Sequence, residues 1–343
     1  MNTTVVGLDL GKNVFQAYGT DANGKTTIRR KLRRSEVLAF FANLPPCLVG
    51  MEACASAHYW AREIIALGHQ VRLMPPKYVR PFVKRNKNDR ADAEAICEAV
   101  QRPNMRFVPV KSELQQGALI LHRTRELLVR QRTQIVNALR GHLAEFGIVA
   151  AQGTGSFPQL RRRLADPDDG KIPAIARTFL QRLVEQLDDT ERKLKAINAD
   201  LAAWAKSSDV CRRLMTIPGV GPVVATALEA TIGDPAFFKS GRCFAAWLGL
   251  VPKQYSTGGK DRLGAITKAG NRYMRKLLIH GGRALLRFPQ GRHAWLANLL
   301  TRRPANVAIV AQANKTARIA WAIMTYGSTY RATAAPLEAS KCA

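Results

Sequence analysis

The chain has 343 residues, of which 47% are hydrophobic, and its 53 Lys and Arg against 25 Asp and Glu give a formal net charge of +28. The hydrophobic content predicts a folded, core-forming protein that is long enough for two or three domains. The charge predicts a polyanionic partner, because binding releases counterions from phosphates, but ribosomal and chromatin proteins are also basic and charge alone indicates no reaction.

The first hundred residues alternate strand and helix signals. The apolar run Val5–Asp9 predicts a buried strand. Val14–Thr20 and Thr26–Leu32 predict a hairpin, because Asn23-Gly24 between them is a strong turn signal. A helix over residues 35–44 is expected next, and two prolines follow it.

A second set of elements completes this region. Leu48–Glu52 and Gln70–Met74 are predicted strands on either side of a helix over His58–Leu67. A basic stretch then leads into a helix that contains Asp89 and Asp92. Three strands, then helix, strand, helix, strand and helix is the order of a ribonuclease-H-like fold. We therefore predict an α/β, RNase H-like domain over residues 1–108.

Four acidic residues of this region are the candidate catalytic metal ligands. Asp9 and Glu52 each end an apolar run, whereas Asp89 and Asp92 lie three apart and share one helix face. Carboxylate oxygens are the ligands that Mg²⁺ prefers, and two such ions can stabilise the attacking and leaving oxygens of a phosphodiester. Each residue alone is more readily explained as a turn, a cap or a complement to the helix dipole. Together, in this order, the four favour a Mg²⁺ site.

The middle of the chain, residues 109–207, is predicted to be a helical coiled-coil spacer. A long basic helix runs over Ser112–Phe146, and the Gly- and Pro-rich residues 149–170 form a helix-hairpin tip. A second helix, Pro173–Lys206, carries a heptad seam that only Thr190 interrupts. An antiparallel hairpin with an internal core is at least as well supported as an intermolecular coiled coil. Either arrangement presents a basic outer face to nucleic acid.

A mainly α C-terminal domain is predicted over residues 208–330, with a flexible tail at 331–343. Ile217-Pro218-Gly219-Val220-Gly221 lies between two apolar helices, which is the helix-hairpin-helix pattern. In that pattern, backbone N–H groups at the glycine turn and the next helix grip a phosphate. A tight helical turn without a ligand would make the same glycines purely structural.

The following segment, Gly249–Lys260, is rich in glycine, hydroxyl groups and cations and is predicted to be a loop that approaches a phosphate backbone. Ser256, Thr257 and Tyr255 are its candidate nucleophiles, although most serines beside glycines are turn residues. The candidate nucleic-acid-binding residues of the whole chain are Lys12, Lys84, Arg85, Lys87, Gly219, Gly221, Gly258, Gly259, Lys260, Arg262, Lys268 and Arg272.

Several short motifs occur together and in one order. They are Gly7-Leu8-Asp9-Leu10-Gly11-Lys12, Met51-Glu52-Ala53, Asn88-Asp89-Arg90-Ala91-Asp92-Ala93, Ile217-Pro218-Gly219-Val220-Gly221, and Ser256-Thr257-Gly258-Gly259-Lys260 with Lys268-Ala269-Gly270-Asn271. Over about Val5 to about Tyr326, the ordered set resembles a DEDD-type transposase of the insertion-sequence one-ten family.

The resemblance implies a RuvC-like N-terminal domain, a coiled-coil spacer and a C-terminal transposase domain. It implies Mg²⁺ held by the four acidic residues, and a catalytic serine that bonds covalently to a DNA 5′ phosphate. The family pattern places glycine directly after the serine, whereas Thr257 separates Ser256 from Gly258 here. Ser256 is therefore favoured by residue type and Thr257 by adjacency to glycine.

The resemblance also implies partners. Members of the family act as tetramers whose RuvC-like and transposase domains combine across subunits. A structured guide RNA from the element pairs with target and donor DNA. Such a protein acts in the bacterial cytosol and nucleoid.

Other features of the chain agree with this location. No secretory segment opens the chain and no apolar run reaches membrane-spanning length, so we expect no membrane partner. The six cysteines show no Cys-x-x-Cys spacing and no ligand cluster with histidine, so we expect reduced thiols and no zinc site.

Two alternatives remain open from the sequence. A Holliday-junction resolvase or another structure-specific nuclease would share the four carboxylates but would hydrolyse DNA with water. A noncatalytic nucleic-acid-binding protein would keep the charge and the helix-hairpin-helix but would have no use for converging carboxylates.

Overall fold

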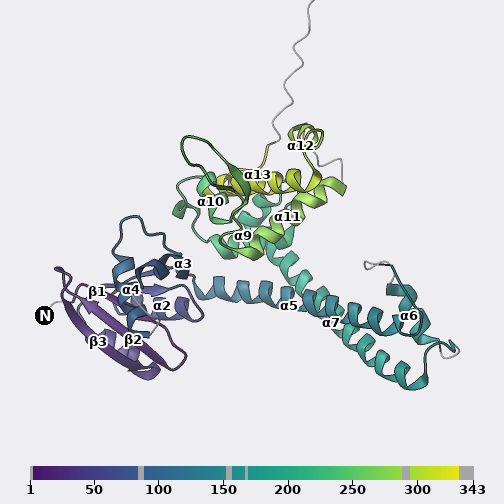
Figure 1. Ribbon diagram of the computed structural model, residues 1–343, viewed down its shortest axis with the longest axis horizontal. Helices are drawn as coiled ribbons and strands as arrows, with labels where there is room; N and C mark the ends of the chain where they lie inside the picture. The colour runs from purple at the N-terminus through teal and green to yellow at the C-terminus, as the bar shows by residue number, and fades with distance from the viewer. Residues whose placement is uncertain (1–2, 84–88, 152–156, 167–168, 288–293, 332–343) are drawn as a thin grey trace, which may run out of the picture. The chain divides into compact units, whose positions relative to one another are not determined.

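The computed structural model describes residues 3–83, 89–151, 157–166, 169–287 and 294–331, and for Asp89 and Arg90 it describes the backbone alone. The predictions for Lys84, Arg85, Lys87 and nearly all of the tail lie outside the described residues. The chain divides into two compact units, Met1–Gln116 and Gly117–Ala343. The first contains a sheet with helices beside it, and the second is mainly helical (Figure 1). The prediction of an α/β N-terminal region followed by many helices is confirmed.

Five strands form the sheet of the first unit, in the order β3-β2-β1-β4-β5. β2 pairs antiparallel with β1 and β3, whereas β4 pairs parallel with β1 and β5. The strands are β1 (Val5–Asp9), β2 (Val14–Thr20), β3 (Thr26–Arg33), β4 (Leu48–Glu52) and β5 (Gln70–Met74). The helices are α1 (Val37–Ala42), α2 (Ala57–Ala66), α3 (Pro76–Val79) and α4 (Asp89–Val100). The β2–β3 hairpin turns at Gly24, whose φ of 79° suits glycine.

Different helices cover the two faces of the sheet, because side chains alternate along each strand. Val6 and Leu8 of β1 pack with apolar residues of α1 and α2 in one core. On the opposite face, Gly7 lies so close to α4 that a Cβ would come 2.3 Å from the carbonyl oxygen of Ala93. Gly50 of β4 approaches the last residue of α4 in a similar way. α4 therefore covers the face to which Asp9 and Glu52, two residues beyond these glycines, also belong.

The direction of α4 follows from two contacts with β1. Cys97 Sγ donates a hydrogen bond to the carbonyl oxygen of Val5 over 3.9 Å, and Ala93, one turn earlier, lies against Gly7. Four helical residues advance by about 6 Å, close to the rise of two strand residues. α4 is thus antiparallel to β1, and its first turn is level with the carboxyl end of β1.

Two long helices, α5 (Glu113–Ala144) and α7 (Ala174–Ser207), pack against one another (Figure 1). Arg125 of α5 donates from Nε to Oδ1 of Asn198 in α7 over 2.7 Å. Thr190, expected to interrupt the seam, is buried and donates its hydroxyl to the carbonyl oxygen one turn earlier. The seam therefore continues through Thr190, because its hydroxyl is satisfied within its own helix.

The segment between these helices corrects a prediction. Residues 149–170 are expected to be a hairpin tip, but they contain a helix, α6 (Phe157–Ala165). Phe157, Leu160 and Leu164 are buried in the core that α5 and α7 share. Their three- and four-residue spacing is helical, and the proline that follows Phe157 is tolerated in a first helical turn. The glycines and prolines around the helix obscure this pattern.

The C-terminal helices are α8 (Asp209–Leu214), α9 (Pro222–Ile232), α10 (Gly241–Trp247), α11 (Arg272–Arg287), α12 (Ala294–Leu300) and α13 (Ala305–Tyr326). All but α12 share a separate core, and Leu296 of α12 packs in a smaller cluster with Leu285 and Ala308. The segment after Gly249, predicted to be a loop, instead contains an antiparallel hairpin of β6 (Pro252–Gln254) and β7 (Leu263–Ile266). Among all the helices that the structure describes, none has the length and apolar character needed to cross a membrane.

Candidate functional site

Asp9 and Glu52 end two neighbouring parallel strands. The register of β1 and β4 pairs Leu8 with Met51, so the next residues along, Asp9 and Glu52, are neighbours on the face that α4 covers. Both carboxylates act on the thiol of Cys54, whose pKa is raised by partial burial first and then by the charges of Glu52 and Asp9. The two negative charges therefore lie near one another at the carboxyl edge of the sheet.

α4 brings further acidic residues toward this edge. Asp92 is half-buried near the start of the helix, and Ala93 and Ile96 beside it are buried against the sheet. Asp89 is the first residue of α4, and its side chain lies outside the described atoms. The close approach that Gly7 permits is what places this first turn near the strand ends.

The donor set at this edge suits a divalent cation. Asp9 and Glu52 offer carboxylate oxygens, and hard cations such as Mg²⁺ commonly take one or two carboxylates from a protein and complete their coordination with water. Among the described side chains, no group of three or more His, Cys, Asp or Glu residues is placed to hold a metal ion, and Asp89 is not among those side chains. Asp92 is described and does not complete such a group with Asp9 and Glu52, so the fit rests on the pair at the strand ends.

Ser256 lies in the β6–β7 hairpin, in the second unit. Its hydroxyl donates to Oδ1 of Asp261 over 2.9 Å, and Nε2 of Gln254 donates to Ser256 Oγ over 3.0 Å. The N–H of Tyr255 donates to the carbonyl oxygen of Arg262, which places positions 256 and 261 opposite one another. The hairpin therefore holds the serine hydroxyl against a carboxylate that can accept its proton.

Thr257 forms the start of the turn that follows. The N–H of Lys260 donates to the carbonyl oxygen of Thr257 over 3.1 Å. Gly258 and Gly259 between them have φ values of 57° and 73°, the left-handed conformation that a two-residue type I′ hairpin turn requires. Among the described hydrogen bonds, the Ser256 hydroxyl reaches a carboxylate and the Thr257 hydroxyl does not.

The glycines of the helix-hairpin-helix pattern differ in their surroundings. Gly219 has a φ of 83°, and a Cβ there would come 2.7 Å from the carbonyl oxygen of Gly281 in α11. Gly221 is exposed at the N-cap of α9, and a Cβ there would meet no atom within 4 Å. Gly219 thus has a packing role, whereas the backbone at Gly221 is open to a ligand.

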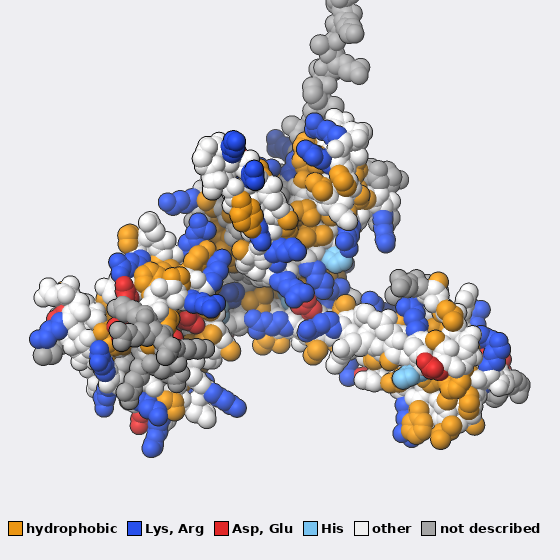
Figure 2. All heavy atoms as spheres, in the orientation of Figure 1, with side chains coloured by type: hydrophobic (Ala, Val, Ile, Leu, Met, Phe, Trp, Pro, Cys, Tyr) orange, Lys and Arg blue, Asp and Glu red, His pale blue; other side chains and the backbone are white. Residues whose placement is uncertain are grey.

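The predicted cationic contacts that the structure describes are all exposed. They are Lys12 after β1, Lys260 and Arg262 in the hairpin, Lys268 before α11 and Arg272 at its first turn. Lys and Arg side chains are spread over the face seen in Figure 2, with fewer Asp and Glu between them. This distribution agrees with the net charge of +28.

Two residues near the predicted sites did not emerge from the sequence. Asp261 pairs with Ser256 because the glycine pair between them makes a two-residue turn, and that turn was the available signal. Gln16 lies opposite Asp9 in the β1–β2 register, and the same counting across the Asn23-Gly24 hairpin extends the row to Lys31 of β3.

Two family descriptions match this chain. Residues 6–148 match the DEDD family of IS110, described as a transposase, and residues 211–296 match the family described as Transposase IS116/IS110/IS902.

Curated relatives agree over nearly the whole length. The probable family 20 transposase of Pseudomonas aeruginosa is 48% identical, with 96% of this chain and 99% of the relative covered. The transposase for insertion sequence element IS1328 of Yersinia enterocolitica is 43% identical, with 96% and 99% covered. The transposase for IS1111A of Coxiella burnetii is 40% identical, with 95% and 91% covered.

The first match gives a DEDD family whose acidic residues suggest a divalent metal, and the relatives act on DNA as transposases. The match begins just before Asp9 and includes β1, β4 and α4. The sheet with its covering helices is consistent with such a domain. The chain therefore belongs to the IS116/IS110/IS902 family of transposases, enzymes that act on DNA.

Proposed function

We propose that this transposase cleaves and rejoins DNA strands at a Mg²⁺ site made by Asp9, Glu52, Asp89 and Asp92, with Ser256 as the nucleophile. The observation that carries the proposal is the adjacency of Asp9 and Glu52 at the ends of parallel strands, beside the first turn of α4. Mg²⁺ bound there supplies stabilisation of the charge that develops on phosphate oxygens.

The proposed domains follow the same logic. The strand order β3-β2-β1-β4-β5, with only β2 antiparallel to its neighbours, supports an RNase H-like, RuvC-like domain over residues 1–108. The pairing of α5 with α7 supports a coiled-coil spacer over 109–207. α8 and α9 flank the glycine turn of the proposed helix-hairpin-helix in a C-terminal domain over 208–330.

The serine step can be written with its atoms balanced. A bond forms between Ser256 Oγ and the scissile phosphorus, and the bond from phosphorus to the 3′ oxygen breaks. The hydroxyl proton of Ser256 passes to Asp261, whose carboxylate already accepts it as a hydrogen bond. The released 3′ oxygen takes up a proton from solvent. Attack by a 3′ hydroxyl on the serine–phosphate bond reverses the step, so rejoining needs no external energy source.

Nucleic-acid contacts and assembly complete the proposal. Exposed cations at Lys12, Lys260, Arg262, Lys268 and Arg272 suit phosphate contacts, as does the open backbone at Gly221. The family resemblance supports a structured guide RNA and a tetramer. Light scattering of the purified protein, with and without the RNA transcribed from its element, measures the assembly state.

The central experiment traps the covalent intermediate. The full-length protein is incubated with Mg²⁺, the element's RNA and labelled DNA that carries the element end, and the products are run on a denaturing gel. We expect a slowly migrating protein–DNA adduct in the wild type and in Thr257→Ala, and none in Ser256→Ala. Asp9→Asn should also lose the adduct while keeping its affinity for DNA.

Asp261→Asn separates proton transfer from folding. Loss of a general base lowers rates by roughly 10² to 10⁴. The adduct should therefore form slowly in this variant and faster as the pH is raised, with DNA affinity unchanged. An adduct that persists in Ser256→Ala and disappears in Thr257→Ala assigns the other hydroxyl. Cleavage without any adduct makes water the nucleophile, as in the resolvase-type alternative.

A further inference from the structure

We propose that an open hollow between the β2–β3 hairpin and α4 holds the backbone of the DNA strand that is being cleaved, with Arg29 and Lys31 contacting its phosphates. The inference rests on the proposed function of the neighbouring carboxylates. We call this hollow the β2–β3 shelf. It is lined by Gln16, Tyr18, Arg29, Lys31, Ala91, Ala93 and Glu94, together with parts of Ala17 and Arg30.

Strand register connects the shelf to the carboxylate edge. Asp9 pairs with Gln16, and Gln16 pairs with Lys31, so the three positions form one row across β1, β2 and β3. Paired residues point to the same face of a sheet, and neighbouring strands are about 4.8 Å apart. Lys31 therefore lies on the α4 face, roughly 10 Å from β1 and in the same row as Asp9.

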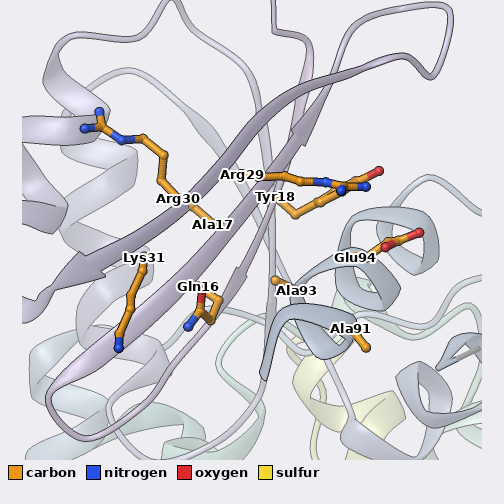
Figure 3. A pocket seen from close by; sticks show the side chains of 9 residues that line it. All are labelled: Gln16, Ala17, Tyr18, Arg29, Arg30, Lys31, Ala91, Ala93 and Glu94. Carbon is orange, nitrogen blue, oxygen red and sulfur yellow. The ribbon is translucent and has the colours of Figure 1, made fainter. Parts of the chain in front are cut away.

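The shelf is large enough for a nucleic-acid backbone. Its volume is about 480 Å³. Ala91 and Ala93 of α4 line one side with methyl groups only, so no long side chain from those positions fills the space (Figure 3). Gln16 and Lys31 extend together at one end, and Arg29 lies by Tyr18 toward the other (Figure 3). A chain of phosphates can thus continue from Asp9 onto the shelf.

Arg29 is held in place before any ligand binds. Its guanidinium lies 5.4 Å from the centroid of the Tyr18 ring, a cation–π contact, and the Tyr18 hydroxyl is 2.7 Å from the Thr26 hydroxyl. Arg29 and Lys31 nevertheless remain exposed. An exposed guanidinium fixed by stacking loses less side-chain freedom when it binds a phosphate oxygen.

Charge explains why such a shelf is needed. Only the scissile phosphate would lie at the proposed Mg²⁺ site, so the phosphates on either side of it need cations from the surrounding surface. Glu94 adds a negative charge at the Arg29 end of the shelf, away from Gln16 and Lys31 (Figure 3). The phosphates therefore follow the Lys31 side, and Arg29 reaches the next one along.

Arg30 is a matched control within the same strand. It is an exposed arginine next to Arg29, and its side chain projects away from the shelf, on the opposite side of β3 (Figure 3). Replacing either Arg29 or Arg30 by Gln removes one positive charge from β3, so the two variants have the same net charge. A difference in DNA affinity between the two variants therefore depends on which face of the sheet carries the arginine. An effect of net charge alone would be the same in both.

The experiment pairs these variants with neutral phosphates. Full-length protein is titrated with labelled DNA that carries its element end, in which one phosphate at a time is replaced by a methylphosphonate. Arg29→Gln and Lys31→Gln should each weaken binding roughly tenfold, the effect of one charge-assisted contact. Each should lower the slope of log affinity against log salt by roughly 0.7 to 0.9. Arg30→Gln should change neither quantity.

The phosphate that each side chain contacts is identified by the position at which a variant no longer responds to the methylphosphonate. At a phosphate next to the scissile one, the methylphosphonate should weaken the wild type but have no further effect on Arg29→Gln or Lys31→Gln. The shelf is refuted if Arg29→Gln and Arg30→Gln bind alike, or if both shelf variants stay as sensitive as the wild type at every position.

Asp9→Asn on the same DNA tests the proposed function separately. Lost cleavage with retained binding supports the carboxylate site even if the shelf is refuted. Full cleavage by Asp9→Asn overturns the carboxylate site, and with it the strand assignment of the shelf.

Discussion

Replacing Gly7 by Ala tests whether the position of α4 on the sheet matters for chemistry. The new Cβ would lie 2.3 Å from the Ala93 carbonyl oxygen and 2.4 Å from the Cys97 nitrogen, whereas ordinary contact begins at 3.4 Å. Both atoms are helix backbone, so no side-chain rotation relieves the overlap. α4 must move away by roughly 1 Å, and overpacking of this kind costs about 1–3 kcal/mol.

The movement should affect rate more than binding. Asp92 is part of α4 and would move with the helix, and displacement of a catalytic group by about 1 Å can lower a rate on the order of 100-fold. We expect Gly7→Ala to lower the midpoint of thermal unfolding by several degrees, to reduce DNA cleavage about 100-fold, and to leave DNA affinity near that of the wild type. Calorimetry, single-turnover cleavage and a binding titration measure the three quantities.

Gly50→Ala is the matched control. Its Cβ would lie 2.8 Å from Cβ of Val100, at the end of α4 farthest from Asp92. It should destabilise the fold by a similar amount and slow cleavage much less. If Gly7→Ala is destabilised but cleaves at the wild-type rate, α4 does not position a catalytic group and Asp92 has no part in the site. If its stability is unchanged, the packing argument itself is wrong.

Three further predictions concern the rest of the chain. His122 is buried beside the Tyr273 hydroxyl, and burial followed by the charge of Arg125 lowers its pKa to about 4. As the pH falls, His122 is protonated in the unfolded chain before it is protonated in the folded one. The free energy of unfolding therefore decreases between about pH 6.5 and pH 4, by up to about 3 kcal/mol. Urea unfolding of His122→Phe should lack this part of the acid sensitivity; identical pH profiles would contradict it. Gly219→Ala should lower the unfolding midpoint by several degrees because its positive φ and the Gly281 carbonyl both oppose a Cβ, whereas Gly117→Ala, with open space, should not. DNA affinity should fall steeply with salt because of the +28 charge, and a flat titration would place the excess cations away from the interface.

The sequence by itself determined the elements that depend on neighbouring residues. Apolar runs gave β1 and β4 with Asp9 and Glu52 at their ends, and Asn23-Gly24 gave the hairpin between β2 and β3. The heptad pattern of residues 173–206 predicted α7, although Thr190 obscured its continuity. These signals are local. The side-chain pattern of a strand or a helix repeats every two to four residues, and a turn involves only a few neighbouring residues.

Only the tertiary structure decided which of these residues meet. The sequence shows Gly7 only as part of a motif, but the approach of α4, more than eighty residues later in the chain, shows that no Cβ fits there. The sequence favours Ser256 by residue type and Thr257 by adjacency to glycine, but the hairpin register sets Ser256 against Asp261. Gly219 matches a phosphate-binding pattern, yet its space is taken by α11. Such contacts join segments that are distant in the chain, so their distances are set by packing and strand register and leave little trace in local sequence.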